Sequence, residues 1–106
     1  MTSVEPKKFG LTERSFTELK QIFAKYPDIR EVYLFGSRAK GTYHVGSDID
    51  LAIMNTDVQP RTLVKVLADC HESSLPNSVD LVDFNTLTNT AFKEHIQRVG
   101  VLFYSV

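Results

Sequence analysis

Residues 36–47, with the sequence GSRAKGTYHVGS, constrain the fold of this chain more than any other stretch. They contain three glycines and two serines, so they cannot continue as a regular strand. The preceding run, Ile29–Phe35, is rich in β-branched and aromatic residues, which favours a strand. The following run, Ile49–Met54, is a second strand candidate and ends at a turn-forming segment, residues 55–57. We therefore expect two short strands joined by a glycine-rich turn.

The remaining pattern predicts helices that alternate with strands. Apolar residues recur at helical spacing in three segments, and two further segments have strand character. In order, we expect a helix from the N-cap Thr12 to about Tyr26, a strand at 29–35, the turn at 36–47, a strand at 49–54, a helix from Pro60, a strand at 78–84, a helix ending at Gly100 and a strand at 101–104. This order predicts a single α/β domain, residues 11–106, with helices packed on one central sheet. Residues 1–10 are expected to be a flexible lead-in.

Composition excludes several classes of protein. The chain has 106 residues, enough for one domain with its own core. Its formal net charge of −1 gives no polybasic footprint, so we expect neither direct nucleic-acid binding nor membrane binding. A single cysteine, Cys70, excludes an internal disulfide, and we interpret it as a core residue. Without a signal peptide or a membrane-spanning run, the expected location is the cytoplasm.

Two aspartates at the start of the second strand indicate chemistry. Residues i and i+2 of a strand point to the same face, so Asp48 and Asp50 present neighbouring carboxylates, whereas Ile49 and Leu51 point to the core. Adjacent carboxylates raise each other's pKa unless a cation lies between them. The cation that fits hard oxygen ligands best is Mg²⁺, which commonly binds one or two carboxylates together with substrate phosphates.

The turn before these aspartates has the character of a phosphate-binding segment. Gly36 and Ser37 follow a strand directly, and small residues let backbone N–H groups approach an anion closely. Arg38 and Lys40 add positive charge to the same turn. A phosphate-binding turn opposite paired carboxylates predicts phosphoryl or nucleotidyl transfer.

A third carboxylate would complete a site for two metal ions. The segment at 78–84 offers Asp80 and Asp83, which face opposite sides of a regular strand. Asp80 lies within the apolar run, whereas Asp83 lies near the strand end, where a solvated carboxylate is ordinary. We favour Asp80.

The motif of Gly36-Ser37, ten residues and Asp48-Ile49-Asp50 resembles the signature of the polymerase-β-like nucleotidyltransferase superfamily. The short segments GSRAKG, GSDIDLAI and VDLVD are similar to segments of the minimal nucleotidyltransferases, the MNT proteins. The resemblance runs from the strand at Ile29 to the end of the chain. It implies a nucleotidyltransferase fold of the α/β (α+β) class, with a mixed sheet flanked by helices.

The resemblance also implies roles for individual residues. Gly36 and Ser37 would hold a nucleoside triphosphate, with Arg38 and Lys40 assisting. Asp48 and Asp50 would bind two Mg²⁺ ions, and Asp80 would join one metal and help to deprotonate the attacking hydroxyl. Lys40 stands where an arginine is common in the family, and lysine keeps the positive charge but lacks the bidentate fork of arginine.

The family further implies a partner. MNT proteins are typically paired with a small helical HEPN protein as the antitoxin of a toxin–antitoxin pair, to which they transfer AMP from ATP. Because the chain has no room for an acceptor domain, a separate acceptor protein is expected. The alternative is a non-catalytic nucleotide-binding module that neutralises its helical partner by occlusion. Transfer to a small molecule such as an aminoglycoside is a third, less favoured hypothesis.

Overall fold

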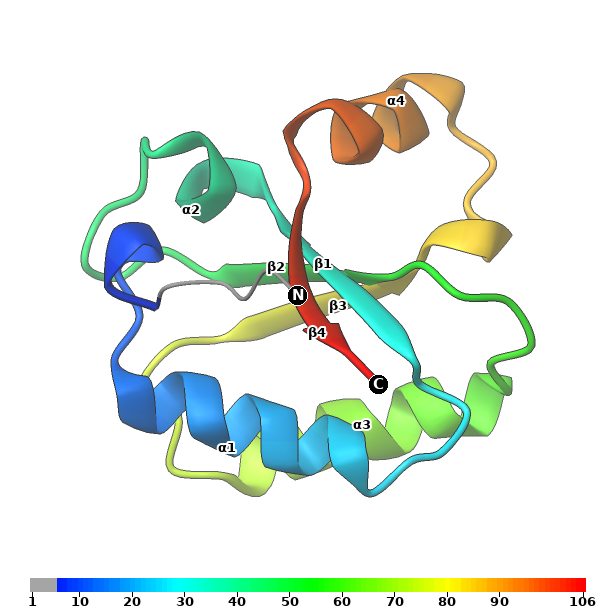
Figure 1. Ribbon diagram of the computed structural model, residues 1–106, viewed down its shortest axis with the longest axis horizontal. Coiled ribbons are helices and arrows are strands. Elements are labelled where there is room, and N and C mark those ends of the chain that lie inside the picture. The colour runs from blue at the N-terminus through cyan, green and yellow to red at the C-terminus, as the bar shows by residue number, and fades with distance from the viewer. Residues whose placement is uncertain (1–5) are drawn as a thin grey trace.

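The computed structural model describes residues 6–106 and shows one four-stranded sheet between two layers of helices (Figure 1). The strands are β1 (Glu31–Phe35), β2 (Ile49–Ile53), β3 (Val79–Asp83) and β4 (Val101–Ser105). The α-helices are α1 (Glu13–Ala24), α2 (Gly36–Lys40), α3 (Pro60–Glu72) and α4 (Thr90–Val99). Short 3₁₀ helices form at Pro6–Phe9 and Phe84–Thr86. The expected single sheet with flanking helices is confirmed.

The sheet is mixed, with strand order β3-β2-β1-β4. β2 pairs with β3 in parallel, and β1 pairs with both β2 and β4 in antiparallel orientation. The end of β1 therefore lies beside the beginnings of β2 and β3. The glycine-rich segment that leaves β1 and the aspartates that open β2 meet at this one end of the sheet.

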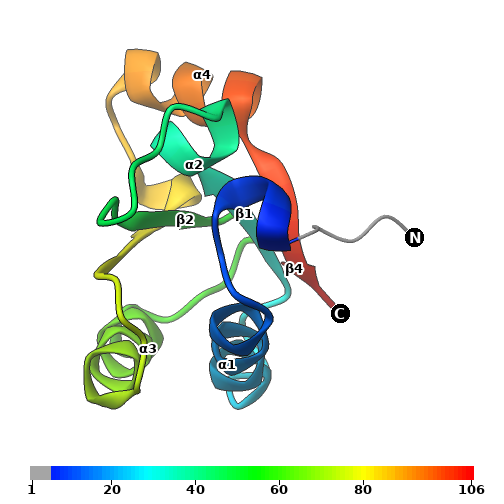
Figure 2. The same cartoon turned by 90° about the vertical axis from the view of Figure 1, so that its left-hand side faces the viewer.

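The two faces of the sheet carry separate apolar clusters. α1 and α3 cover one face, and α2 and α4 lie on the other (Figure 2). Under α1 and α3, Ile49, Leu51 and Ile53 of β2 are fully buried in the larger cluster, as expected from the alternation of the strand. On the other face, Ala52 joins a smaller cluster with Phe35, Phe84 and Ile96. The side chains of β2 that face α2 and α4 are thus Asp50 and Ala52.

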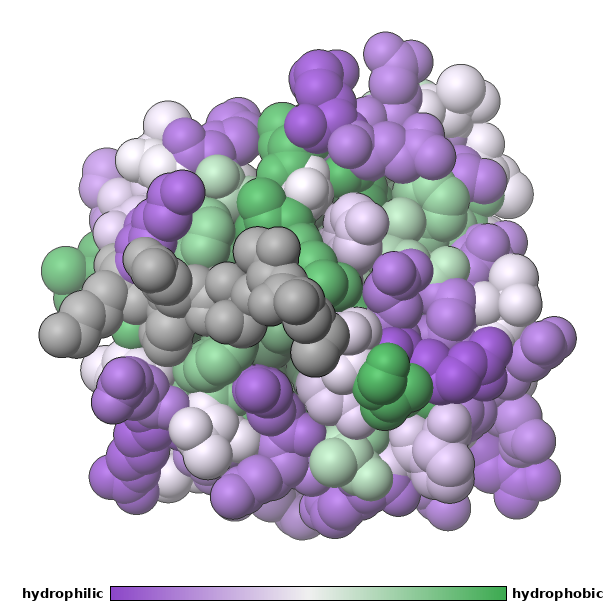
Figure 3. All heavy atoms as spheres, in the orientation of Figure 1, coloured by the Kyte–Doolittle hydropathy of each residue, from purple (hydrophilic) through white to green (hydrophobic). Residues whose placement is uncertain are grey.

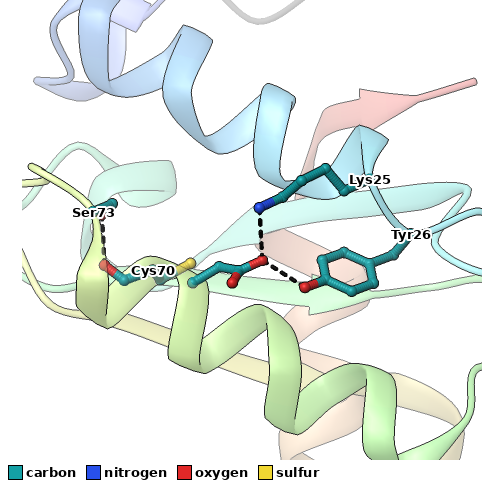
Figure 4. Close-up of polar contacts among 5 residues, drawn as sticks. Lys25, Tyr26, Cys70 and Ser73 are labelled. Carbon is teal, nitrogen blue, oxygen red and sulfur yellow. Dashed lines mark hydrogen bonds and ion pairs between the residues drawn. The ribbon is translucent and has the colours of Figure 1, made fainter.

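Polar contacts join the two helices of the larger layer. Asp69 of α3 accepts a hydrogen bond of 2.5 Å from the Tyr26 hydroxyl and lies 3.0 Å from Lys25 Nζ (Figure 4). In the space-filling view, polar side chains dominate the surface over these helices, whereas apolar surface gathers in the middle of this face near β4 and α4 (Figure 3). No helix within residues 6–106 is long and apolar enough to cross a membrane.

Several boundaries follow the sequence signals. Thr12 is the N-cap of α1, and its side chain accepts a hydrogen bond from Ser15 N. Pro60 is the first residue of α3. Gly100 ends α4 as predicted, but with φ −66° rather than the left-handed geometry of a typical C′ glycine. It is required for space, because a Cβ there would collide with the Ile96 carbonyl and lie 2.9 Å from the Tyr33 ring.

The N-terminal segment corrects one expectation. Residues 1–5 of the expected flexible lead-in lie outside the described residues. Pro6–Phe9 form a 3₁₀ helix, and Phe9 is buried in the larger apolar cluster. Phe9 contributes apolar area to the core, so the described part of the segment belongs to the folded domain.

Candidate functional site

Three aspartates meet at the end of the sheet where β2 and β3 begin. Asp50 and Asp80 are register partners on these parallel strands, and both alternate with core residues of the larger cluster. Both side chains therefore face the α2 and α4 side of the sheet. Asp48 stands two residues before Asp50, at the entrance to β2. The structure brings together the three carboxylates that the sequence singled out.

Asp83 occupies a different position, as its place at the strand end suggested. It precedes the 3₁₀ helix Phe84–Thr86, and its Oδ1 accepts a hydrogen bond of 3.1 Å from Asn85 N. This is the contact of an N-cap residue, which satisfies a free backbone N–H group. Of the two candidates on β3, only Asp80 is the register partner of Asp50.

Gly36 brings the backbone of the glycine-rich segment close to the Asp50 carboxylate. Its φ is +74°, a conformation that side-chain-bearing residues rarely adopt. A Cβ at this position would collide with Asp50 Oδ2. The backbone of Gly36 therefore lies directly against the Asp50 carboxylate, and only glycine leaves room for this approach.

Residues 36–40 form a short helix, which the sequence did not indicate. Gly36 and Ser37 are its first two residues, and its N-cap, Phe35, makes no side-chain capping hydrogen bond. Ser37 is half-buried. The first N–H groups of a helix have no partners within the helix, so the segment presents donors at the carboxylate end of the sheet.

Charge and burial act on Asp50 together. Burial raises the pKa of its carboxyl, and the neighbouring carboxylates of Asp80 and Asp48 raise it further, while the Arg38 guanidinium opposes them. Two carboxylates held close together disfavour each other's ionised form. This end of the sheet is thus a negative site that would gain from a bound cation.

The donor set fits a hard divalent cation that binds jointly with a ligand. Carboxylate oxygens are suitable ligands for Mg²⁺, which usually keeps waters or substrate phosphates in its coordination shell. Among residues 6–106, no group of three or more acidic, histidine or cysteine side chains is gathered tightly enough to enclose a metal ion. The carboxylate oxygens of Asp48, Asp50 and Asp80 are nevertheless of the chemical kind that such a cation prefers.

Arg38 does not lie where the sequence suggested. Its side chain is 1% exposed, and its guanidinium donates to the carbonyl oxygens of Phe9, Gly10 and Ser47. The expectation that Arg38 assists in holding a triphosphate is therefore corrected, because its guanidinium is buried beneath other chain segments. Lys40, in contrast, is exposed at the end of α2.

Other candidate residues behave as ordinary structural groups. His44 is exposed in the loop after α2. Cys70 is buried, and burial raises the pKa of its thiol to about 11, so it stays protonated and unreactive near neutral pH. Cys70 and His71 line a cavity of about 590 Å³ beside the segment that leads into β3, and the lining of this cavity includes none of the three aspartates.

Two residues that support the site were missed by sequence reasoning. Asn77 donates hydrogen bonds of 3.2 Å to the carbonyls of Val45 and Ser47, and thereby braces the loop before Asp48. Ser47 closes that loop, because its hydroxyl accepts from His44 N at 2.7 Å. Serine and asparagine between periodic segments indicate a loop in any protein, so nothing in the sequence distinguished these two.

The chain is similar to two proteins that carry the name protein adenylyltransferase. The chain is 37% identical over 68 residues to the protein adenylyltransferase MntA of Shewanella oneidensis, covering 64% of this chain and 49% of that protein. It is 39% identical over 89 residues to a Haemophilus influenzae protein named as a probable protein adenylyltransferase, MntA, covering 81% and 72%. The chain thus spans about half the length of the Shewanella relative.

A solved structure shares the fold. A crystal structure of a toxin–antitoxin with AMP-PNP superimposes with a TM-score of 0.68 at 28% identity, covering 91% of this chain and 75% of the other. Residues 17–106 match the family described as polymerase beta, nucleotidyltransferase, a span that contains the glycine-rich segment and all three aspartates. With most of its length matched to that family, this chain belongs to the polymerase beta nucleotidyltransferases.

Proposed function

We propose that this protein transfers AMP from ATP to a hydroxyl group of a helical HEPN-type partner protein and acts as the antitoxin of that partner. The observation that supports this function most is the register pairing of Asp50 with Asp80 beside Gly36. Two relatives that carry the name protein adenylyltransferase, and the similar toxin–antitoxin structure with AMP-PNP, support the choice of nucleotide and of partner.

The site residues have distinct proposed roles. Asp48, Asp50 and Asp80 would hold Mg²⁺, two ions in the arrangement that we favour. When bound, the metal would neutralise charge on the phosphates and on the attacking oxygen. Gly36 and Ser37 would bind the triphosphate through the N–H groups at the start of α2. Lys40 would add a mobile positive charge nearby, without the fixed fork that an arginine provides.

The proposed reaction is a direct in-line displacement. The acceptor oxygen forms a bond to the α-phosphorus of ATP, the bond between that phosphorus and the bridging oxygen of pyrophosphate breaks, and pyrophosphate leaves. Asp80 would accept the proton of the attacking hydroxyl. The protein contributes mainly position and charge, as is usual for transfer of phosphorus groups. We place the reaction in the cytoplasm, where ATP and a reduced Cys70 are both expected.

The test uses ATP labelled at the α-phosphate, Mg²⁺, the purified protein and a lysate of its own source. A parallel reaction contains γ-labelled ATP, and another contains the Asp48→Ala/Asp50→Ala double variant. We expect one protein band that carries only the α-label and only with the wild-type protein. The mass of the labelled band identifies the acceptor protein. The stability of the label in acid and in base indicates which kind of side chain carries the AMP.

The same system separates transfer from occlusion. If the partner is present and unmodified, and no band is labelled, the adenylyltransferase proposal fails. If the Asp50→Ala variant neutralises the partner as well as wild type at equal expression, binding suffices and catalysis is dispensable. A label that also arises from γ-labelled ATP would indicate phosphorylation instead.

A further inference from the structure

Arg38 of α2 is a buried cation whose side chain contacts two other parts of the chain, residues 9–10 and residue 47. Its Nη1 donates to Phe9 O at 2.9 Å and to Gly10 O at 3.1 Å, and its Nη2 donates to Ser47 O at 2.8 Å. The Nε atom has no hydrogen-bond partner among the described residues. The Tyr43 ring lies 5.3 Å from the guanidinium carbon.

Such a residue is costly to bury. A guanidinium remains charged at any physiological pH, and its transfer from water is unfavourable unless hydrogen bonds replace the lost solvent. Here the three hydrogen bonds to backbone carbonyls and the contact with the Tyr43 ring provide this compensation. Those acceptors are fixed points on the chain, so the guanidinium holds residues 9–10 and residue 47 at defined distances from α2.

One of the segments held by Arg38 leads directly to the proposed metal site. The Ser47 carbonyl belongs to the peptide that joins Ser47 to Asp48, so its position fixes the start of the Asp48 backbone. The same carbonyl accepts from Asn77 Nδ2 at 3.2 Å. Ser47 N also donates to His44 O at 3.0 Å, which closes the turn. The approach to Asp48 is thus fixed from α2 on one side and from the β3 side on the other.

The N-terminal segment closes over the same guanidinium. Gly10 has φ +72°, and a Cβ there would collide with the Tyr43 ring and lie 2.8 Å from Arg38 Nη1. On each side of Gly10, Phe9 and Leu11 are buried in the larger apolar cluster. The segment is therefore anchored in the core and pressed against Arg38 and Tyr43 where no side chain would fit.

We propose that Arg38 is a positioning residue that holds the Ser47–Asp48 backbone in place and does not contact the nucleotide. The importance of Asp48 in this inference rests on the proposed function. That Arg38 holds the loop in place does not depend on the proposed function. Loss of Arg38 would release Ser47 O from α2 and leave it with the weaker contact to Asn77. Asp48 would then lose its fixed position relative to Asp50.

The first test measures amide hydrogen exchange without nucleotide or partner. Arg38→Met keeps an unbranched side chain but removes every donor. Arg30→Met is the matched control, because Arg30 is exposed and donates to the Thr56 carbonyl at the opposite end of the sheet, at 3.4 Å. We expect Arg38→Met to accelerate exchange in residues 44–48 by roughly tenfold or more, with β1 unchanged. The control should alter neither region.

The second test determines whether loss of Arg38 changes kcat for AMP transfer or KM for ATP. In Arg38→Met we expect kcat for AMP transfer to fall about 10- to 100-fold, with KM for ATP within about twofold of wild type, because a misplaced metal ligand slows the chemical step. Arg38→Lys should recover part of kcat, since an ammonium can reach one of the carbonyls. A rise in KM with unchanged kcat would overturn the proposal and indicate a phosphate contact.

The exchange experiment remains decisive if the wild-type protein shows no transfer activity. Faster exchange throughout the sheet would mean that Arg38 only stabilises the fold, and unchanged exchange at 44–48 would mean that it does not hold the loop. Either result overturns the proposal independently of the function. If Arg38→Met does not fold, Gly10→Ala perturbs the same contact from the N-terminal side. It should accelerate exchange in the same residues, and unchanged exchange there would count against the proposal.

Discussion

The two ends of the sheet treat their carboxylates in opposite ways. At the end where β1 begins, Asp28 accepts hydrogen bonds from Gln59 N at 3.1 Å and from the Thr62 hydroxyl at 2.7 Å. Burial, the largest single influence, raises the pKa of Asp28, but these hydrogen bonds and the charge of Arg30 outweigh it and lower the pKa overall. At the other end, burial and the carboxylates of Asp80 and Asp48 raise the pKa of Asp50.

The difference separates an end of the sheet whose polar groups are paired within the protein from the end where we propose the metal site. Around Asp28, the neighbouring Asn55 also accepts from the backbone N–H groups of Arg30 and Glu31, so the polar groups satisfy each other within the protein. Around Asp50, the protein gathers like charges, and a bound cation would neutralise them. Active sites commonly carry such unfavourable electrostatics at a cost in stability. Variants at the two ends can therefore test whether the contrast holds.

The strongest consequence that we expect is the loss of transfer on neutralising Asp50. Asp50→Asn removes one proposed metal ligand, and we expect AMP transfer to fall by about 1,000-fold or more. Asp83→Asn is the matched control on β3, because a side-chain amide oxygen can still accept from Asn85 N. It should retain activity within about twofold of wild type. The measurement is transfer of α-labelled AMP to the partner, and comparable losses in both variants would abolish the contrast.

A second comparison concerns two glycines of the same segment. Gly36 (φ +74°) lies against the Asp50 carboxylate, whereas a Cβ on Gly41 (φ +85°) would meet no described atom within 4 Å. Gly41→Ala should cost only the backbone strain, about 1 kcal/mol, and leave transfer nearly intact. Gly36→Ala adds a collision with Asp50 and should cost about 2–4 kcal/mol and most of the activity.

Urea denaturation and the transfer assay on both variants measure these differences. Because both glycines have a positive φ, backbone strain alone predicts similar effects. Equal losses of stability and of activity would therefore show that the close approach of Gly36 to Asp50 has no importance of its own.

Local sequence patterns predicted the elements but not the contacts between them. Periodicity predicted α1, α3, α4 and the four strands near their observed bounds but missed the short helix α2. The mixed sheet agrees with the family resemblance. The spacing of Asp48 and Asp50 predicts one shared face, but only Asp50 lies within β2, and Asp48 precedes the strand. On β3, Asp80 rather than Asp83 is the register partner of Asp50. The pairing of Asp50 with Asp80 could be predicted because it depends on the two-residue repeat of a strand, whereas the roles of the three aspartates stay predictions.

The expectations for Arg38 and for the N-terminal residues were wrong because both depend on long-range contacts. An arginine that follows glycine and serine suggests a phosphate contact, and only the tertiary fold reveals that Arg38 meets the carbonyls of Phe9, Gly10 and Ser47 instead. The N-terminal residues were expected to be a lead-in, yet the side chain of Phe9 is buried in the larger apolar cluster. Long-range partners of this kind have no signature in a single sequence.

A third prediction is that the two ends respond to charge removal with opposite signs. Asp28→Ala leaves Gln59 N and the Thr62 hydroxyl without their acceptor and should destabilise the protein by about 1–3 kcal/mol. Asp50→Asn removes repulsion and should raise the melting temperature in the absence of metal and nucleotide. Thermal unfolding of both variants beside wild type measures the signs, and a loss of stability in Asp50→Asn would contradict the electrostatic account.

The pH dependence of these effects follows from the two pKa directions. The folded pKa of Asp28 lies below its ordinary value of 3.8, so its stabilising contribution is present above pH 3.8 and is lost as the pH falls through the folded value. The folded pKa of Asp50 lies above 3.8, so its contribution is present below pH 3.8 and is lost as the pH rises through the folded value. Both variants should therefore approach wild-type stability in acid.

The weakest effect that we predict lies away from both ends, between α1 and α3. The hydrogen bond from Tyr26 to Asp69, together with burial and the negative charge of Asp69, raises the pKa of Tyr26 to about 12 from its ordinary 10.0 (Figure 4). A raised pKa means that this contribution to stability is full below pH 10.0 and is lost as the pH rises through about 12. Of the four tyrosines, Tyr26 should ionise late in an alkaline titration followed by ultraviolet absorbance.

The control for this titration is Tyr26→Phe, which should remove the late component and lower the melting temperature slightly. Its transfer activity should match wild type, because the contact with Asp69 lies on the face of the sheet that α1 and α3 cover, away from Asp50 and Asp80. A late tyrosine that persists in Tyr26→Phe would assign the shift to another residue. Reduced transfer in a fully folded Tyr26→Phe protein would instead show that the contact between α1 and α3 affects the site at Asp50 and Asp80. The two regions would then not be independent of each other.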